Sequence, residues 1–304
     1  MNTHQRGYTL IELMISMLLG LMMISGFGSL FSQTQKSSTI QRSLSYMMED
    51  GRYILEVFGR ELRRTNSLRS KMTATGSAAV VFTADPLVLG STMNFGPGDY
   101  IRGDYNAAGF GTAFNINQLA LRYQLTNIDE LAQTDPNSTN SACERQILLG
   151  AGEDPATQVH VVTLYFFIDF DATTNAPVLY CLAKRQNFST SPVTTVTSTA
   201  EPLISNVQKL VITYGIDSDD ADANGIGDDG NANYYVAADS IGGAGQPTWQ
   251  QVVAAKLSVV LRSEDDNLAT TSVSYTVDGA TGSPFTAADK RLYRVSSTTI
   301  AFRN

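Results

Sequence analysis

The sequence predicts an α+β protein in which one long N-terminal helix precedes a large, mainly antiparallel β head. Three observations predict this class. Residues 7–31 form an almost uninterrupted apolar stretch, and residues 40–62 carry apolar side chains at spacings of three, four and seven. From about residue 70, short apolar runs with a period of two alternate with turn residues. No block of fixed length repeats, and the head is long enough for one large domain or two small ones.

The apolar stretch from Gly7 to Phe31 contains a single charged residue, Glu12. As a helix rising ~1.5 Å per residue, Tyr8–Phe31 would be roughly 36 Å long and could cross the ~30 Å hydrocarbon core of a membrane. A charge at mid-helix costs roughly 2.5–3.5 kcal/mol there. An uncleaved signal anchor with Glu12 near the interface is one explanation. A cleaved secretory signal peptide fits poorly, because no small-x-small site follows the apolar run.

The same stretch resembles the processing motif of type IV prepilins. A short basic leader ends at Gly7, an aromatic residue follows at Tyr8 where most family members have Phe, and Thr-Leu-Ile-Glu then ends at Glu12. The resemblance implies cleavage after Gly7 by a prepilin peptidase and N-methylation of Tyr8. It also implies that Glu12 pairs with such an amine, its own or a neighbour's, which offsets the cost of holding both charges away from water.

Four segments follow from this interpretation. They are a leader (1–7), a transmembrane and fibre-core helix (8–31), an amphipathic continuation (32–66) and a periplasmic β-rich head (67–304). The helix is expected to end near Arg64–Ser67, where three polar residues interrupt the apolar pattern. The apolar positions of the continuation are Ile40, Leu44, Met47, Ile54, Phe58 and Leu62.

The period-two runs after residue 70 predict the strands of the head, with Ser/Thr-rich 189–200 and Gly-rich 241–247 among the connecting loops and one helical turn within 249–254. Asp169 and Asp171 end one of the runs, where a turn role is expected. The predicted strands are 78–83, 100–102, 118–125, 160–170, 178–184, 209–214, 255–262, 271–277 and 292–302.

Cys143 and Cys181 are the two cysteines, and both lie in the head. The prepilin topology would place the head in the oxidising periplasm, so a disulfide is expected, with two buried free thiols as the alternative. Closing a loop of this size stabilises a fold by roughly 3–4 kcal/mol. His160 is the only histidine left after removal of the leader, which excludes a His-rich zinc site.

One acidic loop, DSDDADANGIGDDG at residues 217–230, has the spacing of a calcium ligand set. A hard cation could be held by oxygens of Asp220, Asp222, Asn224, Ile226 (its carbonyl) and Asp228. Residue 231 is Asn where an EF-hand has Glu, and no helix flanks the loop. A shorter EF-hand-like calcium loop between strands therefore fits the sequence better than a true EF-hand does. A second frame from Asp217 and Asp219 stays open, as does a charged hairpin tip that binds no metal.

The net charge of −8 argues against general nucleic-acid binding, although a local basic patch at 60–69 is present. A solvated helix end near anionic lipid explains that patch as well. The sequence contains no G-x-S-x-G, P-loop, dinucleotide fingerprint or His-containing metal motif. We therefore expect neither catalysis nor an organic cofactor, with Ca²⁺ as the one candidate ligand ion.

Three C-terminal stretches, Val207–Asp219, Trp249–Ser263 and Arg291–Asn304, resemble PilW-type minor pilins, and the large head also suggests a minor subunit. The resemblance implies a protein that primes pilus assembly with other minor pilins and sits at the pilus tip, in twitching motility and adhesion. Implied partners are minor and major pilins, the prepilin peptidase and the inner-membrane assembly platform. The implied location is the inner membrane with a periplasmic head, then the pilus.

Two alternatives remain. The related J-type pseudopilins of type II secretion have a similar plan, with a bulky head that caps a short fibre. A membrane-anchored, calcium-dependent binding module or adhesin that never enters a fibre is the other alternative. Cleavage after Gly7 distinguishes this last alternative from the two pilin interpretations.

Overall fold

The computed structural model describes residues 9–74, 95–96, 99–104, 118–125, 143–155, 157–218, 230–277 and 285–302. The chain divides into two compact units, Met1–Tyr46 and Met47–Asn304. Helix α1 (Leu10–Ala74) begins in the first unit and ends in the second. The predicted calcium ligands at 220–228 and the predicted strand at 78–83 lie outside the described residues.

The part of α1 in the first unit is rich in Leu, Ile and Met, which lose little side-chain freedom in a helix or fill space flexibly. Its most apolar 18-residue window has a mean hydropathy of 2.1, and none of that window is buried. By length and composition, α1 is therefore able to cross a membrane.

The helix extends farther than the sequence predicted. It runs through Ala74, whereas an end near Arg64–Ser67 was expected, so that prediction is wrong. The hydroxyl of Thr65 donates a hydrogen bond to the carbonyl of Leu62 at 2.7 Å, which satisfies this polar side chain inside the helix. Residues 65–67 have a modest helix propensity. Good helix formers such as Leu68, Arg69 and Lys71 follow them, so helix α1 continues.

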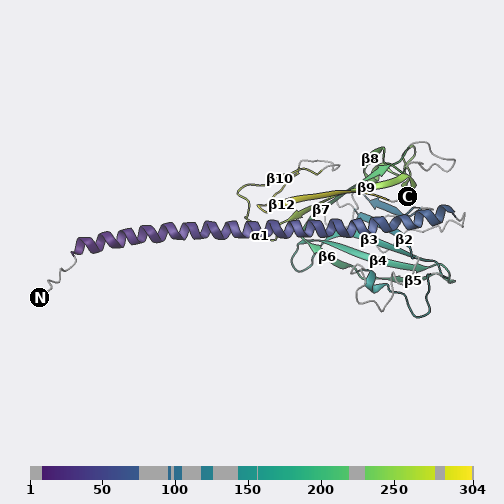
Figure 1. Ribbon diagram of the computed structural model, residues 1–304, viewed down its shortest axis with the longest axis horizontal. Coiled ribbons are helices and arrows are strands. Elements are labelled where there is room, and N and C mark those ends of the chain that lie inside the picture. The colour runs from purple at the N-terminus through teal and green to yellow at the C-terminus, as the bar shows by residue number, and fades with distance from the viewer. Residues whose placement is uncertain are drawn as a thin grey trace. The chain divides into compact units, whose positions relative to one another are not determined.

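The second unit contains two larger antiparallel sheets and one short hairpin (Figure 1). The first sheet has the order β1-β2-β3-β4-β5, with β6 also paired to β4. Its strands are β1 (Ile101–Asp104), β2 (Gln118–Gln124), β3 (His160–Phe170), β4 (Pro177–Asn187), β5 (Thr194–Thr197) and β6 (Glu201–Ser205).

The second sheet has the order β12-β9-β7-β8, and β10 pairs with β11. The single-turn 3₁₀ helices are η2 (Glu144–Gln146), η3 (Ala238–Ser240) and η4 (Trp249–Gln251). The strands are β7 (Val207–Ile216), β8 (Tyr234–Val236), β9 (Val252–Arg262), β10 (Ser274–Tyr275), β11 (Phe285–Thr286) and β12 (Tyr293–Ala301). A long helix with a mainly antiparallel β head confirms the predicted α+β class.

The longer strands confirm the period-two predictions. The predicted strand 160–170 coincides with β3, and the bounds of β1, β2, β4, β7, β9 and β12 differ from prediction by at most three residues. Asp171 follows β3 and accepts hydrogen bonds from the backbone N–H groups of Thr173 and Thr174, which confirms its turn role.

The short strands were harder to predict. Residues 189–200 were expected to form a loop, yet β5 lies within them and pairs with residues 184–187 of β4. Its Thr and Val residues favour strands once a neighbouring strand offers hydrogen-bond partners. The strand expected at 271–277 is reduced to β10, and β6 was not predicted.

The main core forms where the second half of α1 packs against both sheets. Figure 1 shows the strands of both sheets along this half of the helix. Met47, Ile54, Phe58 and Leu62 are buried there, as their spacing predicted, whereas Leu44 is exposed and Ile40 only half-buried. The ring of Phe58 lies 4.9 Å from that of Phe166 in β3, measured between centroids.

Gly51 lets helix and sheet approach closely at one point of this core. A Cβ at this position would lie 2.5 Å from the hydroxyl oxygen of Ser296 in β12 and 3.3 Å from a methyl carbon of Leu261 in β9. Contacts this short would force the Ser296 hydroxyl to rotate and the neighbouring carbons to shift, which favours glycine here despite its low helix propensity.

A disulfide joins the segment before η2 to β4. It links Cys143 and Cys181, whose Cα atoms lie 6.0 Å apart, and both residues are buried in the main core. This confirms the disulfide expected from the two cysteines. It also fixes the irregular segment 143–155 against the first sheet.

Candidate functional site

The surface of residues 10–31 is apolar and exposed in this single chain. Leu10 is 79% exposed, Phe27 70% and Phe31 65%, and most of the large apolar side chains between them are more than half exposed. Soluble proteins rarely expose continuous apolar surface of this size. Lipid or other apolar helices must therefore cover this segment.

Glu12 takes part in the cap at the start of α1. Its Oε2 accepts hydrogen bonds from the backbone N–H and the hydroxyl of Thr9, both at 3.0 Å, and the N–H of Glu12 lies 3.4 Å from the Thr9 hydroxyl oxygen. This reciprocal arrangement is a capping box, which satisfies two backbone donors that a helix start otherwise leaves open. Its signature is present in the sequence as Thr-x-x-Glu at residues 9–12.

The cap leaves part of the Glu12 carboxylate for a second partner. Both bonds from Thr9 end on Oε2, and no described residue donates to Oε1. Gly7 and Tyr8 lie outside the described residues, so pairing between Glu12 and the Tyr8 amine stays a prediction.

Gly20, Gly26 and Gly28 lie along the same exposed segment. A Cβ built at any of them has no described atom within 4 Å, so packing within this chain does not require glycine at these positions. Small residues on membrane helices allow other helices to approach closely, which suits a segment that is covered by neighbours.

A buried ion network ties α1 to the head and accounts for part of the basic patch seen in the sequence. Nη1 of Arg64 lies 3.2 Å from Oε2 of Glu61 and 2.7 Å from Oε1 of Glu144, and the Arg64 guanidinium lies over the ring of Tyr123. Arg60 also pairs with Glu61, at 2.9 Å. These two arginines of the 60–69 patch are therefore engaged in the fold.

Burial raises the pKa of Glu61, and the neighbouring Glu144 carboxylate raises it further. Arg64 binds both carboxylates, although Arg64 and Glu144 are 80 residues apart in the sequence. The sequence contains no signal for that pairing.

A second buried network surrounds His160, which is fully buried at the start of β3. Its Nδ1 lies 3.1 Å from Nη1 of Arg185, and its Nε2 lies 3.0 Å from the side-chain oxygen of Gln158. Because arginine can only donate, Nδ1 accepts and the ring proton is on Nε2. Arg185 also pairs with Glu153 at 2.8 Å.

This arrangement predicts a loss of stability on mild acidification. Burial and the adjacent Arg185 lower the pKa of His160 below its ordinary value. The unfolded chain binds the proton near pH ~6.5, so the stabilisation is complete above that pH and is lost as pH falls through the folded pKa. We expect the melting temperature of the purified chain to fall between pH 7 and pH 5, and to fall less in His160→Gln.

The parent chain provides the control for this measurement. Glu61, whose pKa is raised, acts in the opposite direction, because its stabilisation is complete at low pH and is lost as pH rises. Only the difference between parent and His160→Gln isolates the histidine. Equal pH dependence in the two proteins would contradict the assigned role of His160.

Asp217 lies at the start of the acidic loop and is fully buried. Its Oδ2 accepts a hydrogen bond from the N–H of Gly230 at 2.9 Å, whereas Oδ1 has no partner among the described residues. The backbone N–H of Ser218 donates to the side-chain oxygen of Asn233 at 2.7 Å, so both stems of the loop are held together. An unpaired oxygen on a buried carboxylate is unfavourable unless a cation or a donor binds it.

The described residues contain no group of three or more His, Cys, Asp or Glu side chains placed to bind a metal. The predicted ligands Asp220, Asp222, Asn224, Ile226 and Asp228 lie outside those residues. Asp217, from the second frame, is thus the one candidate ligand in the described structure.

Comparison with known families agrees with this architecture. Two family models match parts of this chain, one at its apolar helix and one in its β head. Residues 2–28 match the family model of the prokaryotic N-terminal methylation motif, and residues 165–304 match that of type IV pilus-assembly protein W. Together these matches support a type IV pilus-related pilin and are consistent with a minor pilin. Searches among curated proteins and solved structures gave no match.

The matches cover the two ends of the chain. The first includes Gly7, Tyr8 and Glu12, and the second runs from residue 165, within β3, past the end of β12. They point to a structural pilus protein rather than an enzyme, anchored in a membrane through α1.

Proposed function

We propose that this chain is a minor pilin that primes assembly of a type IV pilus together with other minor pilins and sits at the pilus tip. One observation carries the proposal. An exposed apolar helix with a polar group near its start, Glu12, is joined to a large folded head. The helix requires lipid first and packed neighbouring helices later, while the head stays in water.

The disulfide supports the proposed location. Disulfides persist in oxidising compartments such as the bacterial periplasm, so the Cys143–Cys181 bond suits a head on that side of the inner membrane. Positively charged residues favour the cytoplasmic side of a membrane helix, and the short segment before the helix carries Arg6. After assembly the same head is carried into the pilus.

Processing at Gly7 is the first prediction to test. Mass spectrometry of fibres sheared from cells should find a peptide that begins at methylated Tyr8, at low abundance beside a major pilin. The Gly7→Ala variant should keep its Met1 terminus and remain in membranes, because the prepilin motif has glycine at the cut and an added methyl group there should block the peptidase. A Tyr8 terminus found only in membranes would favour a secretion pseudopilin, and an intact Met1 terminus in the parent would refute processing.

Priming needs a separate experiment. Cells that lack this chain should make few fibres while the major pilin accumulates in the membrane, and the unchanged gene should restore fibre number. Normal fibre number in its absence would contradict a priming role and leave only a role in the finished fibre.

We also propose that the acidic loop binds Ca²⁺, with Asp217 as a buried ligand at its base. The support is the unpaired Oδ1 of Asp217, together with the oxygen-rich sequence between Asp217 and Gly230. Hard cations such as Ca²⁺ take six to eight oxygen ligands, about the number that such a loop can supply.

Calcium should raise the melting temperature of the purified chain relative to EDTA. The rise should disappear in the double variant Asp220→Ala/Asp222→Ala and shrink in Asp217→Asn, because each removes ligand oxygens. The matched control Glu264→Ala/Asp265→Ala removes the same charge from an exposed turn and should keep the rise. No calcium-dependent rise in the parent, or an equal loss in the control, would exclude the site.

A further inference from the structure

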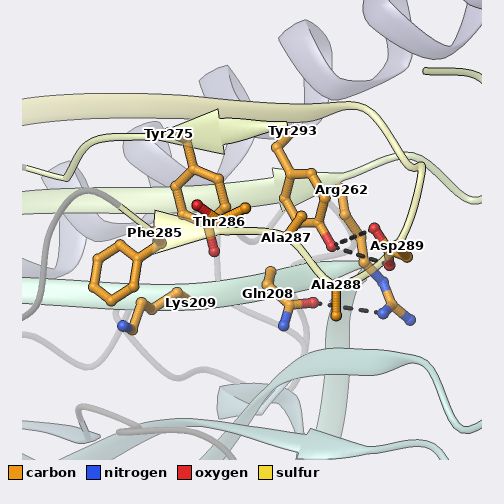
Figure 2. A pocket seen from close by; sticks show the side chains of 10 residues that line it. All are labelled: Gln208, Lys209, Arg262, Tyr275, Phe285, Thr286, Ala287, Ala288, Asp289 and Tyr293. Atoms are coloured by element: carbon orange, nitrogen blue, oxygen red, sulfur yellow. Dashed lines mark hydrogen bonds between the residues drawn. The ribbon is translucent and has the colours of Figure 1, made fainter. Parts of the chain in front are cut away.

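A cavity of about 410 Å³ lies on the second sheet, within the size range of small-molecule sites. Alternate residues of β7 and β9 point to opposite faces of this sheet. Leu210 and Val259 enter the main core, whereas Val211 and Val260 form a separate small cluster under the β10–β11 hairpin. Figure 2 shows the cavity between this hairpin and the sheet.

Two cations from neighbouring strands line the cavity. In the sheet, Lys209 is directly opposite Val260, and Arg262 lies two residues farther along β9 opposite Tyr293. Residues two apart in a strand share a face, so both cationic side chains face the hairpin. Figure 2 shows both side chains at the wall of the cavity.

Neither cation has a carboxylate partner within the described part of the chain. The Lys209 ammonium lies 3.5 Å from the centroid of the Phe285 ring. Arg262 has only neutral acceptors, the side-chain oxygens of Asn206 and Gln208, both at 3.5 Å. Burial lowers the pKa of both Lys209 and Arg262. The nearby Arg291 lowers the pKa of Arg262 further, while the carboxylates of Asp289 and Asp266 act in the opposite direction without forming a salt bridge to it.

Two further polar groups of the cavity that have no described hydrogen-bond partner can also donate hydrogen bonds. Among the described residues, the amide nitrogen of Gln208 and the hydroxyl of Tyr275 have no partner. The one carboxylate of the lining, Asp289, already accepts from the Tyr293 hydroxyl at 3.0 Å and lies 3.6 Å from Nε of Arg291, so the two lining cations outnumber the negative charge of the cavity. A ligand must therefore supply acceptors and negative charge.

We propose that this cavity binds an acidic sugar of the uronate type. Its carboxylate would bind Arg262, where charge-assisted hydrogen bonds are strong, and a ring oxygen or hydroxyl would accept from Lys209 at the other end of the cavity (Figure 2). Its ring oxygens and hydroxyls would accept from Gln208 and Tyr275, and the aromatic walls at Tyr275 and Phe285 would cover its carbon skeleton. This goes beyond the proposed role in assembly and does not depend on it.

A sugar fits this lining better than an acidic peptide does. A peptide brings one backbone N–H donor for nearly every carbonyl, and the cavity has few free acceptors for those donors. A sugar hydroxyl also carries a donor, but it can rotate, so its oxygen accepts from Gln208 or Tyr275 while its hydrogen turns towards Asp289 or solvent; a backbone N–H has a fixed direction. An apolar aromatic ligand would leave both cations unpaired, which is unfavourable.

The test uses the full processed chain in detergent and a tetrasaccharide that contains glucuronate, with binding measured by calorimetry. We expect saturable binding that weakens as salt rises, because salt screens the ion pair. Lys209→Met and Arg262→Gln should each lower the affinity by about tenfold or more, since a hydrogen bond to a charged group is worth roughly 1.5–3 kcal/mol. Lys290→Met removes an exposed cation outside the cavity lining and should bind as the parent does.

Three competing probes decide the ligand class. A neutral glucose tetrasaccharide, sulfate alone and a peptide with the same number of carboxylates should all bind at least about tenfold more weakly than the uronate, a difference of roughly 1.4 kcal/mol. Equal binding of any of them, or equal affinity of the parent and Lys209→Met, would overturn the proposal. Because binding is measured on the isolated chain, a negative result leaves the pilus-assembly experiments unaffected.

Discussion

A Glu12→Gln chain should be cleaved after Gly7 and folded in the membrane, yet nearly absent from fibres. Glutamine at this position can keep the cap with Thr9, because capping boxes accept Glu or Gln. It removes the negative charge that would pair with a Tyr8 amine among packed helices. Breaking a buried ion pair costs about 3–5 kcal/mol, so incorporation should fall by roughly a hundredfold or more.

Two further variants separate charge from capping. Glu12→Ala removes both and should also be excluded from fibres while its head stays folded. Ser16→Ala removes a hydroxyl that bonds only to helix carbonyls, those of Glu12 at 2.8 Å and Leu13 at 3.0 Å, and should enter fibres normally. Quantitative blots of sheared fibres and of membranes measure how much of each variant is in the fibres relative to the membrane. Normal incorporation of Glu12→Gln beside failure of Glu12→Ala would show that the cap matters and the charge does not.

Removing the disulfide should produce the largest loss of stability in the head. Cys143→Ser/Cys181→Ser opens a loop with a sequence separation of 38 residues. On the chain-entropy account, this lowers the free energy of unfolding by about 3–4 kcal/mol. For a unit of this size, the melting temperature should fall by roughly 6–16 °C.

The reducing agent dithiothreitol gives the matched control for this prediction. It should lower the melting temperature of the parent towards that of the double serine variant and leave the variant unchanged. Circular dichroism of the chain in detergent follows both transitions. Equal melting temperatures for parent and variant under oxidising conditions would mean that the bond does not stabilise the head.

The two predictions concern different parts of the molecule and fail independently. Loss of the disulfide acts on the head and should lower the amount of folded protein before assembly begins. Loss of the Glu12 charge acts on the apolar segment and should leave the melting temperature of the head unchanged. Measuring both properties on every variant therefore separates a folding defect from an assembly defect.

The local features of this protein could be read from its sequence. The apolar segment, its single charge at Glu12, the buried positions of α1 and the long strands such as β3 all depend on periodicities within a few residues. The disulfide could be predicted because the chain has two cysteines and the head is expected in an oxidising compartment. The Thr9–Glu12 cap is also readable, because its Thr-x-x-Glu signature spans only four residues.

Only the tertiary structure decided which distant residues meet. The sequence indicates neither the contact of Arg64 with Glu144 nor the cavity that Lys209, Arg262 and Phe285 share, because strand pairing and packing bring these residues together from far along the chain. Short strands such as β5 depend in the same way on a neighbour that supplies hydrogen bonds. Periodicity shows which face of an element is apolar, but the choice of partner is made by the free energy of the whole packed arrangement.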